Sequence, residues 1–424
     1  MRILIVVIDF PALSETYVLD QITGLIDRGF DVDILASKMR DEATIHPDVE
    51  DYSLLNRAYY IDNSPPSGSR IARWTLIFAR LVRRGRFRLM REAAVAGLRR
   101  AFGLPVLIGA LQLVAYAHTL ERLPTPDMVV CHFGPTGDLM VRLRRATKAK
   151  WPILTFFHGY DLSLLLQKNG PGIYRRLFRE GDFFLPVSRF FQKRLVSIGA
   201  APDRMAVHRM GVKVQPHLRT SKHASARAQN EFSFLSIGRL VEKKGLEFAI
   251  RAVARCREVN PELKMTLSIV GDGPLHNHLR DTVDSLGLGN LVQLLGSMHR
   301  EQVVDKLQTA NAFLLPSVTT ETGDIEGIPV SISEAMAMGL PVISTYHSGI
   351  PEIIEHEING FLVPERDVDA LADAMCRIVR DRSLADRMGR AGREKVEREL
   401  DLDRWNDLLS DRIRDLGRVL QAAE

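Results

Sequence analysis

Short runs of β-branched and other apolar residues alternate with helix-length amphipathic segments along most of the chain. This alternation is typical of layered α/β folds with parallel sheets. In the first half, strands are predicted at Arg2–Asp9, Phe30–Ser37, Met128–Phe133, Ile153–His158, Phe183–Val187 and Met205–Met210. In the second half, strands are predicted at Phe232–Ile237, Met265–Val270, Val292–Leu295, Ala312–Leu315, Val342–Ser344 and Gly360–Val363.

A helix is predicted between the first two strands, over Thr16–Arg28. Its apolar positions share one face and comprise Val18, Ile22, Leu25 and Ile26. Gly29 is suited to the left-handed conformation that ends many helices. Either Ser14 or Thr16 is suited to capping the start of this helix.

The periodicity stops between Lys213 and Asn230, in a polar stretch that Pro216 interrupts and that is typical of a linker. A chain of 424 residues is too long for one ordinary core. We therefore expect an N-terminal domain over 1–212, a linker over 213–230, a C-terminal domain over 231–395 and a helical tail over 396–424 that returns to the N-terminal domain. Two open parallel sheets leave a cleft between them, and ligands of such folds lie at the carboxyl ends of the strands.

The composition is that of a globular protein, because 46% of the residues are hydrophobic and 26% are charged. Three cysteines, Cys131, Cys256 and Cys376, lie far apart in the sequence, which excludes a disulfide framework and a Cys-x-x-Cys metal site. The apolar run near the N-terminus is short and ends at Asp9, so a first buried strand explains it better than a secretory signal. These features favour a cytoplasmic protein.

The net charge of +5 is unevenly distributed. Residues 70–100 hold ten arginines and one acid, Glu92, so this stretch carries +9 and the rest of the chain −4. Aromatic and basic residues occur there at helical spacing, which favours a helix on an anionic membrane surface. The residues expected at that surface are Arg73, Trp74, Arg80, Arg83 and Arg84. A solvated basic helix and a nucleic-acid site are the alternatives. The uncharged stretch 101–117 is expected to be a buried or surface-lying helix rather than a membrane span.

The segment from Leu315 to Pro351 is the richest in candidate chemistry. Glu326 precedes a predicted helix over Val330–Met338, and Glu334 lies inside that helix. Eight residues at the helical rise place the two carboxylates at most roughly 12 Å apart, a span that matches the hydroxyl groups at the two ends of a nucleotide sugar. The N–H groups of Gly327, Ile328 and Val330 would face the diphosphate between them. The alternative is that both acids are ordinary solvated residues.

A second candidate segment is the loop after the strand Phe232–Ile237. Arg239 and Lys244 lie in it, and two fixed cations there would neutralise a leaving diphosphate without a metal ion; two solvated cations are the alternative. Gly271 and Gly273 follow the next strand, where turn geometry alone explains them.

Two candidates lie in the first half of the chain. His158 ends an apolar strand and is followed by Gly159, a position that suits a ligand contact as well as a structural histidine. The loop after the first strand contains Ser14, Glu15 and Thr16, which are suited either to helix capping or to contact with an acceptor.

These motifs carry a resemblance. GRLVEKKG, VGDGP and EGIPVSISEAMAMGLPVIST occur in the order and spacing of the large retaining glycosyltransferase family numbered four, which has the GT-B fold of two Rossmann-like domains. SETY, HGYD and STYHSGIPE look like the bacterial exopolysaccharide transferases of the colanic-acid and amylovoran type. The resemblance covers nearly the whole chain and is strongest over 232–365.

The resemblance implies roles for individual residues. Glu326 would hold the donor sugar and Glu334 the ribose hydroxyls, while Arg239 and Lys244 would bind the diphosphate and assist its departure. His158 would contact the donor sugar, and Met298 would lie near the nucleotide base. Asp161 of the HGYD motif would lie on the acceptor side with Ser14, Glu15 and Thr16. Many relatives have a glycine pair after the first strand, whereas this chain has Pro11-Ala12-Leu13-Ser14, which puts a phosphate contact from that loop in doubt.

The reaction that the resemblance implies is transfer of a hexose from a UDP- or GDP-sugar to a polyprenyl-diphosphate-linked saccharide, with retention of configuration. The protein would need no cofactor or metal ion, because no Asp-x-Asp motif stands at the end of a predicted strand and the two cations serve the metal's electrostatic purpose. It would act on the inner face of the cytoplasmic membrane and bind no nucleic acid. The alternatives are a nucleotide-sugar epimerase of the same architecture and a non-catalytic protein that binds nucleotide sugars or anionic lipids.

Overall fold

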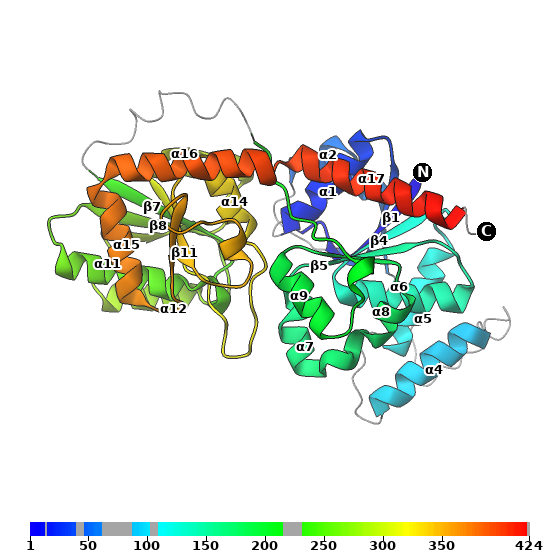
Figure 1. The fold of residues 1–424 in the computed structure, drawn as a ribbon. Helices are drawn as coiled ribbons and strands as arrows, with labels where there is room; N and C mark the ends of the chain where they lie inside the picture. The colour runs from blue at the N-terminus through cyan, green and yellow to red at the C-terminus, as the bar shows by residue number, and fades with distance from the viewer. Residues whose placement is uncertain (13–14, 40–45, 62–86, 102–108, 215–230, 422–424) are drawn as a thin grey trace. The chain divides into compact units, whose positions relative to one another are not determined.

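The computed structural model describes residues 1–12, 15–39, 46–61, 87–101, 109–214 and 231–421 (Figure 1). It divides into two compact units. Unit 1 comprises Met1–Pro186, Gln192–His208 and Asn406–Glu424, and unit 2 comprises Val187–Phe191 and Arg209–Trp405. None of the helices within the described ranges is long and apolar enough to cross a membrane.

Unit 1 is built around a six-stranded parallel sheet in the order β3-β2-β1-β4-β5-β6. Its strands are β1 (Arg2–Phe10), β2 (Asp31–Met39), β3 (Ala58–Tyr60), β4 (Met128–His132), β5 (Ile153–Phe157) and β6 (Phe183–Pro186). Its helices are α1 (Thr16–Asp27), α2 (Pro47–Asp51), α4 (Phe87–Ala101), α5 (Ala110–Leu120), α6 (Gly134–Thr147), α7 (Leu164–Asn169) and α8 (Arg175–Glu180), with most of α9 (Arg189–Ser197). Five of the six predicted strands are confirmed here, and the first is the buried strand that the sequence predicts.

Unit 2 repeats this plan with a parallel sheet in the order β12-β11-β10-β7-β8-β9. Its strands are β7 (Phe232–Ile237), β8 (Met265–Val270), β9 (Val292–Leu294), β10 (Ala312–Leu315), β11 (Val342–Thr345) and β12 (Gly360–Val363). Its helices are α11 (Leu246–Val259), α12 (His276–Ser285), α13 (Arg300–Thr309), α14 (Val330–Ala337), α15 (Val368–Arg380) and α16 (Arg382–Glu399). The predicted α/β class is confirmed, and so is every strand predicted for this half.

The last helix, α17 (Leu402–Gln421), belongs to unit 1 from Asn406 onward. Its Asp407 accepts a hydrogen bond from Arg28 at 2.7 Å, and Asn406 Nδ2 donates to the carbonyl of Asp20 at 3.2 Å. Gly24 leaves room for this contact, since a Cβ there would lie 2.0 Å from Asn406 Nδ2. The predicted return of the C-terminal helix to the N-terminal domain is therefore confirmed.

Two predictions about unit 1 need correction, and one strand was missed. Met205–Met210 is not a strand: Ala206 and His208 donate backbone hydrogen bonds to Phe184 and Pro186 of β6, but the pairing amounts to an isolated bridge and not to a continuous ladder. The N-cap of α1 is Glu15, with no side-chain cap, because Thr16 is already the first helical residue. β3 was not predicted, since three residues at a sheet edge show no periodic pattern. The end of α1 is as predicted, with Gly29 at φ +80°.

Two of the three cysteines meet in the core of unit 2. Cys256 of α11 and Cys376 of α15 are free thiols whose sulfur atoms lie 3.3 Å apart. The wide sequence separation gave no sign of this contact. All three cysteines are buried. The predicted linker falls mostly on 215–230, outside the described residues, and stays a prediction.

Candidate functional site

The sheet order of unit 2 identifies where a ligand would bind. The connections from β7 and β10 leave in opposite directions, and these neighbouring strands form a topological switch point, where ligands of doubly wound sheets lie. The loop after β7 carries Arg239 and Lys244, and the loop after β10 carries Glu326. The fold therefore brings both sequence-predicted segments to one edge of the sheet.

Backbone contacts hold these two loops against each other. Gly245 adopts a left-handed conformation at φ +63°, and a Cβ on it would lie 1.9 Å from the carbonyl oxygen of Pro316. The N–H of Val318 donates to the carbonyl of Lys243 at 3.0 Å. Only glycine permits this approach at position 245, and the approach directs Lys243 and Lys244 toward the loop after β10.

Glu326 is buried between two lysines. Lys244 Nζ lies 3.3 Å from its Oε2 and Lys243 Nζ 3.8 Å from its Oε1, while Lys243 also pairs with Asp324 at 3.1 Å. Burial would raise the pKa of the Glu326 carboxyl, but Lys244 and then Lys243 outweigh it, so the pKa is lowered and the carboxylate is ionised. Its buried Oε1 accepts no hydrogen bond within the described residues, so it can still accept one from a ligand hydroxyl.

The other residues predicted for the donor site differ in how far they are exposed and in the contacts that they make. Arg239 is exposed and makes no ion pair within the described part of the chain, whereas Lys244 is committed to Glu326. Glu334 lies on α14, partly exposed, and Met298 packs on the core in the loop after β9. The N–H groups of Gly327, Ile328 and Val330 precede or begin α14 as predicted and donate to no acceptor among the described residues.

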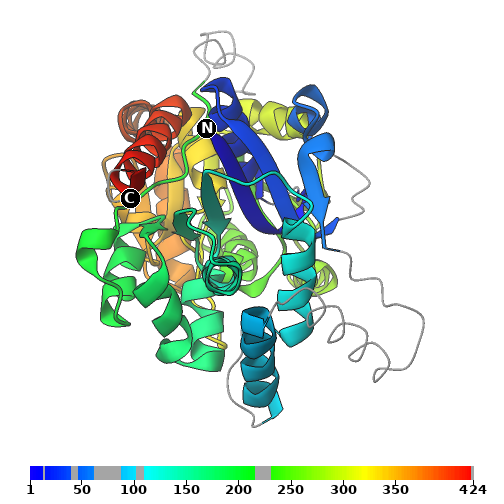
Figure 2. The same cartoon turned by 90° about the vertical axis from the view of Figure 1, so that its right-hand side faces the viewer.

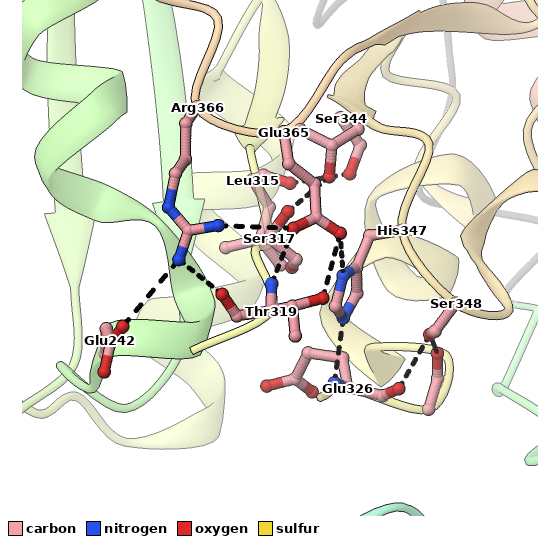
Figure 3. A network of polar contacts seen from close by, with 12 residues as sticks. Glu242, Leu315, Ser317, Thr319, Glu326, Ser344, His347, Ser348, Glu365 and Arg366 are labelled. Carbon is pink, nitrogen blue, oxygen red and sulfur yellow. Dashed lines mark hydrogen bonds and ion pairs between the residues drawn. The ribbon is translucent and has the colours of Figure 1, made fainter. Parts of the chain in front are cut away.

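A network of hydrogen bonds that the sequence did not predict fixes the backbone of the loop that carries Glu326 (Figure 3). The backbone N–H of Glu326 donates to Nε2 of His347 at 3.0 Å, and Nδ1 of His347 lies 2.6 Å from Oε1 of Glu365. Ser348 Oγ lies 2.7 Å from the carbonyl of Glu326 and 2.9 Å from that of Gly327. His347 and Ser348 stand in the STYHSGIPE motif, but nothing in the sequence shows that they reach Glu326.

The glycines of the VGDGP turn permit close backbone contact. A Cβ on Gly271 would lie 2.0 Å from the carbonyl oxygen of Gly238, and one on Gly273 would lie 2.7 Å from that of Leu240. Leu240 N–H donates to the carbonyl of Asp272 at 2.9 Å. The geometric explanation of these glycines is therefore confirmed, and they support the loop that carries Arg239.

Unit 1 has its own switch point between β1 and β4. His132 ends β4 and His158 follows β5, and Nδ1 of His132 lies 3.1 Å from Nε2 of His158. Burial lowers the pKa of His132 to about 3 and that of His158 well below its usual value, so both rings are neutral. Phe133 between β4 and α6 has φ +75°, a strained conformation of the kind that clusters at functional sites. His158 was predicted as a site residue, but His132 was not.

The prediction that Asp161 contacts an acceptor is replaced by a supporting role. Asp161 is fully buried, and its carboxylate accepts hydrogen bonds from the backbone N–H groups of Gly134, His158 and Gly159 at 2.9–3.1 Å. Burial outweighs these bonds and raises its pKa to about 6. Asp161 therefore fixes the loop that carries His158, and the exposed neighbour Tyr160 is the residue of this motif that faces solvent.

The predicted acceptor loop is only partly described. Glu15 and Thr16 begin α1, Ser14 lies outside the described residues, and the ring of Tyr17 lies 4.8 Å from that of His158. The predicted contact of this loop with an acceptor stays a prediction.

The basic stretch is described only from Phe87 onward, so Arg73, Trp74, Arg80, Arg83 and Arg84 lie outside the described residues. Its single acid, Glu92, is buried on α4 and pairs with Arg176 at 2.5 Å and with Arg145 at 3.6 Å. Ala93 and Ala96 of α4 pack with Val114 of α5. The two helices lie next to each other (Figure 2). Arg88 and Arg91 are exposed on α4. Glu92 thus attaches α4 to unit 1, while basic side chains of the same helix face solvent.

Comparison with known proteins identifies the family. Residues 219–395 match the family described as glycosyl transferases group 1, and residues 14–211 match the glycosyl transferase 4-like domain. WcaL of Escherichia coli K12, named for colanic acid biosynthesis, is 35% identical over 100% of both chains. The amylovoran biosynthesis glycosyltransferase AmsK of Erwinia amylovora is 34% identical over 94% of this chain and 96% of its own. The chain belongs to this family of glycosyltransferases, as its motifs indicate.

Solved structures show the same fold. Anabaena HepE, crystallised with UDP and glucose, is 19% identical with a TM-score of 0.73 over 98% of this chain and 99% of its own. A mutant of S. aureus TarM, crystallised in a complex that contains UDP, is 12% identical with a TM-score of 0.70 over 97% of this chain and 99% of its own. This likeness confirms the predicted GT-B fold.

Proposed function

We propose that this glycosyltransferase moves a hexose from a nucleoside diphosphate sugar to a polyprenyl-diphosphate-linked saccharide during exopolysaccharide synthesis, with retention of configuration. The observation that carries the proposal is the buried, ionised Glu326 at the switch point, with two lysines beside it and an Oε1 that accepts no hydrogen bond within the described residues. The names of WcaL and AmsK support the pathway, and the UDP and glucose bound to HepE support the donor class.

In this proposal, the donor lies along the edge of the unit 2 sheet. Oε1 of Glu326 accepts a hydrogen bond from a sugar hydroxyl, and Glu334 on α14 accepts from the ribose. The diphosphate faces the N–H groups of Gly327, Ile328 and Val330, where the start of α14 favours negative charge. Met298 lies on the side of the base.

The chemical step replaces one bond at the anomeric carbon by another on the same face. The bond from this carbon to the phosphate oxygen breaks, the bond to the acceptor oxygen forms, and the acceptor proton passes to the departing phosphate. Arg239 and Lys244 stabilise the charge that develops on the diphosphate, and His158 contacts the donor sugar. The exposed guanidinium of Arg239 is free to move toward the phosphate, which supports a reaction that requires no divalent ion.

We place the protein at the inner face of the cytoplasmic membrane, where a lipid-linked acceptor would be presented. The cluster of ten arginines over 70–100 supports this placement, since anionic lipids attract such segments. The exposed Arg88 and Arg91 on α4, attached to unit 1 through Glu92, extend the basic surface into the described part of the chain.

A thermal-shift panel tests the donor site. The purified protein is heated with UDP, GDP, ADP or dTDP, with and without magnesium, because a ligand that binds only the folded state raises the midpoint. We expect one nucleoside diphosphate to stabilise the protein without magnesium and Glu334→Ala to abolish the effect. No shift with any of the four contradicts the donor-site assignment. Release of nucleoside diphosphate that needs no acceptor, with an isomerised sugar as product, would instead support an epimerase.

A further inference from the structure

We infer that His347 is a positioning residue for Glu326, and that Glu365 selects the imidazole tautomer in which it does so. This inference rests on the proposed function, which gives Glu326 its role toward the donor sugar. His347 touches no reacting atom in the proposal; it acts through the peptide group of Glu326.

The need for such a residue follows from where Glu326 lies. It stands in the irregular loop between β10 and α14, where neither strand nor helix supplies hydrogen-bond partners for the backbone. A buried backbone N–H requires an acceptor, and for Glu326 that acceptor is Nε2 of His347 at 3.0 Å. Ser348 Oγ lies within hydrogen-bond distance of the carbonyl groups of Glu326 and Gly327. The N–H and carbonyl groups of Glu326 are thus both held by neighbouring residues of one segment.

The directions of the hydrogen bonds determine the tautomer of His347. A backbone N–H can only donate, so Nε2 must be unprotonated and the neutral ring carries its proton on Nδ1. Nδ1 then donates to Oε1 of Glu365 at 2.6 Å. Burial raises the pKa of Glu365, but the N–H of Thr319 and the ring of His347 outweigh it, so the pKa is lowered and the carboxylate is an acceptor only. Each hydrogen bond in this series therefore has one donor and one acceptor: the N–H of Glu326 donates to His347, and His347 donates to Glu365.

Glu365 is itself fixed from the other side. Its Oε2 accepts from the N–H of Thr319 at 2.7 Å, and Arg366 lies 3.7 Å from the same oxygen. Arg366 also donates to the carbonyl of Thr319. Thr319 and Glu326 belong to the same loop, so the network is hydrogen-bonded to this loop at two residues (Figure 3). The arrangement follows from the sheet order, because β12, β11 and β10 are neighbours and His347 and Glu365 follow β11 and β12.

Two amide substitutions at position 347 separate the two hydrogen bonds of His347, the one that it accepts from Glu326 and the one that it donates to Glu365. The amide of glutamine reaches the position of the imidazole Nε2, so His347→Gln keeps an acceptor for the Glu326 N–H. The amide of asparagine reaches only the position of Nδ1, so His347→Asn keeps the donor to Glu365 and loses the acceptor. We expect His347→Asn to lower the rate of nucleoside diphosphate release at least tenfold with little change in KM, and His347→Gln to restore most of that rate.

Glu365→Gln tests the tautomer. The N–H of Thr319 requires the amide oxygen of the new side chain, which turns the amide NH2 toward Nδ1 of His347. Nδ1 must then accept, the ring proton moves to Nε2, and two donors face each other at Glu326. We expect a loss comparable to that of His347→Asn, and almost no further loss when Glu365→Gln is added to His347→Gln. Nitrogen-15 NMR of labelled histidine checks the tautomer directly, since the signal that His347→Gln removes should report a proton on Nδ1.

The rate of nucleoside diphosphate release is measured with UDP-glucose, UDP-galactose, GDP-mannose and GDP-fucose as probes. His356 provides the matched control, because its Nδ1 also accepts a backbone N–H, that of Leu362 at 3.1 Å, but it makes no contact with Glu326. His356→Asn and His356→Gln should keep the parent rate. Equal rates for His347→Asn and the parent, in a protein that Glu326→Gln inactivates, would overturn the inference alone. A parent protein that releases nucleotide from none of the probes would overturn the proposed function and the inference with it.

Discussion

Lys244 Nζ lies 3.3 Å from Oε2 of Glu326, and the two residues come from loops that follow neighbouring parallel strands, β7 and β10. The lysine therefore does two things in the proposed enzyme: it keeps the carboxylate ionised despite burial, and it places a cation beside the leaving diphosphate. Both consequences can be measured.

Loss of either partner should remove most of the turnover. Glu326→Gln and Lys244→Met keep the approximate shape of each side chain, and we expect each to reduce kcat by roughly 10²–10³-fold, the range seen when one group that stabilises developing charge is removed. Circular dichroism should show an intact fold. Lys243→Met is the matched control, because Lys243 lies 3.8 Å from Glu326 and is shared with Asp324, so its loss should cost less. An equal loss in Lys243→Met would contradict the assignment of Lys244.

The pH dependence of turnover should reveal the same pair. The pKa of Glu326 is lowered from its usual value of 4.5, so the carboxylate is charged at every pH above that value, and the stability it contributes is lost only as the pH falls through the lower folded pKa. The parent should show no acidic limb from Glu326 above pH 4.5. In Lys244→Met, the group that most strongly opposes burial is lost, so the pKa of Glu326 should rise and an acidic limb should move to higher pH. Profiles of kcat/KM that coincide would contradict the ion pair.

The close approach of the two loops predicts a cost at Gly245. Gly245→Ala introduces a Cβ 1.9 Å from the carbonyl oxygen of Pro316 at a residue with φ +63°. We expect destabilisation of about 1–3 kcal/mol from backbone strain, increased by the steric clash, together with loss of turnover. Gly287→Ala is the matched control, since φ is +62° and nothing lies within 4 Å of its Cβ. Gly287→Ala reports the strain alone, and the additional fall in melting temperature in Gly245→Ala reports the clash. Equal melting temperatures for the two variants would show that the loops are free to move apart.

The sequence predicted the strands of both sheets closely, because buried parallel strands are continuous apolar runs bounded by turn residues. It also predicted that Glu326 lies before a helix, which local spacing alone determines. It did not predict that Lys243 contacts Asp324, that His132 contacts His158, or that Cys256 contacts Cys376 at 3.3 Å. These pairs form between segments up to 120 residues apart, and only the order of strands in the sheet brings them together.

Two predictions were wrong because local sequence does not show which groups from other segments a residue contacts. Asp161 follows a histidine and a glycine at a strand end, which resembles a ligand contact, yet its carboxylate turns inward to three backbone N–H groups. Residue type and spacing do not show in which direction a loop side chain points. Met205–Met210 has the composition of a strand and donates two backbone hydrogen bonds to β6, from Ala206 to Phe184 and from His208 to Pro186, yet it forms only an isolated bridge there. Composition does not show whether such pairing continues into a ladder.

Unit 1 should lose stability in acid before unit 2. Burial lowers the pKa of His132 and of His208 to about 3, whereas the unfolded value is 6.5, so the unfolded chain binds more protons between these limits. Each ring should remove up to about 1.4 kcal/mol per pH unit as the pH falls through this window. Asp161 opposes them: its pKa is raised to about 6, so its contribution is complete below pH 3.8 and is lost as the pH rises through 6.

Hydrogen exchange at a series of pH values can resolve the two units. Amides of β4 and β5 should lose protection between about pH 6.5 and 4, while those of β10 and β11 change less. Asp161→Asn cannot gain a proton, so it should steepen the loss in unit 1 below about pH 6. Parallel loss of protection in both sheets, or no effect of Asp161→Asn, would show that these buried groups do not control acid stability.

Attachment of α4 should depend on one carboxylate in an otherwise basic stretch. Glu92 is buried and pairs with Arg176 at 2.5 Å and Arg145 at 3.6 Å, so Glu92→Ala leaves the half-buried Arg176 without this partner, at a cost of about 3–5 kcal/mol by analogy with other broken buried pairs. We expect faster exchange of α4 amides in this variant, with unit 2 unchanged. Glu92→Gln keeps one acceptor and should have a smaller effect.

If α4 presents the basic surface to the membrane, Glu92→Ala should also weaken sedimentation with vesicles of anionic lipid, while nucleotide binding to unit 2 persists. Faster exchange in α4 with unchanged vesicle binding would show that the membrane contact does not require this helix to be attached.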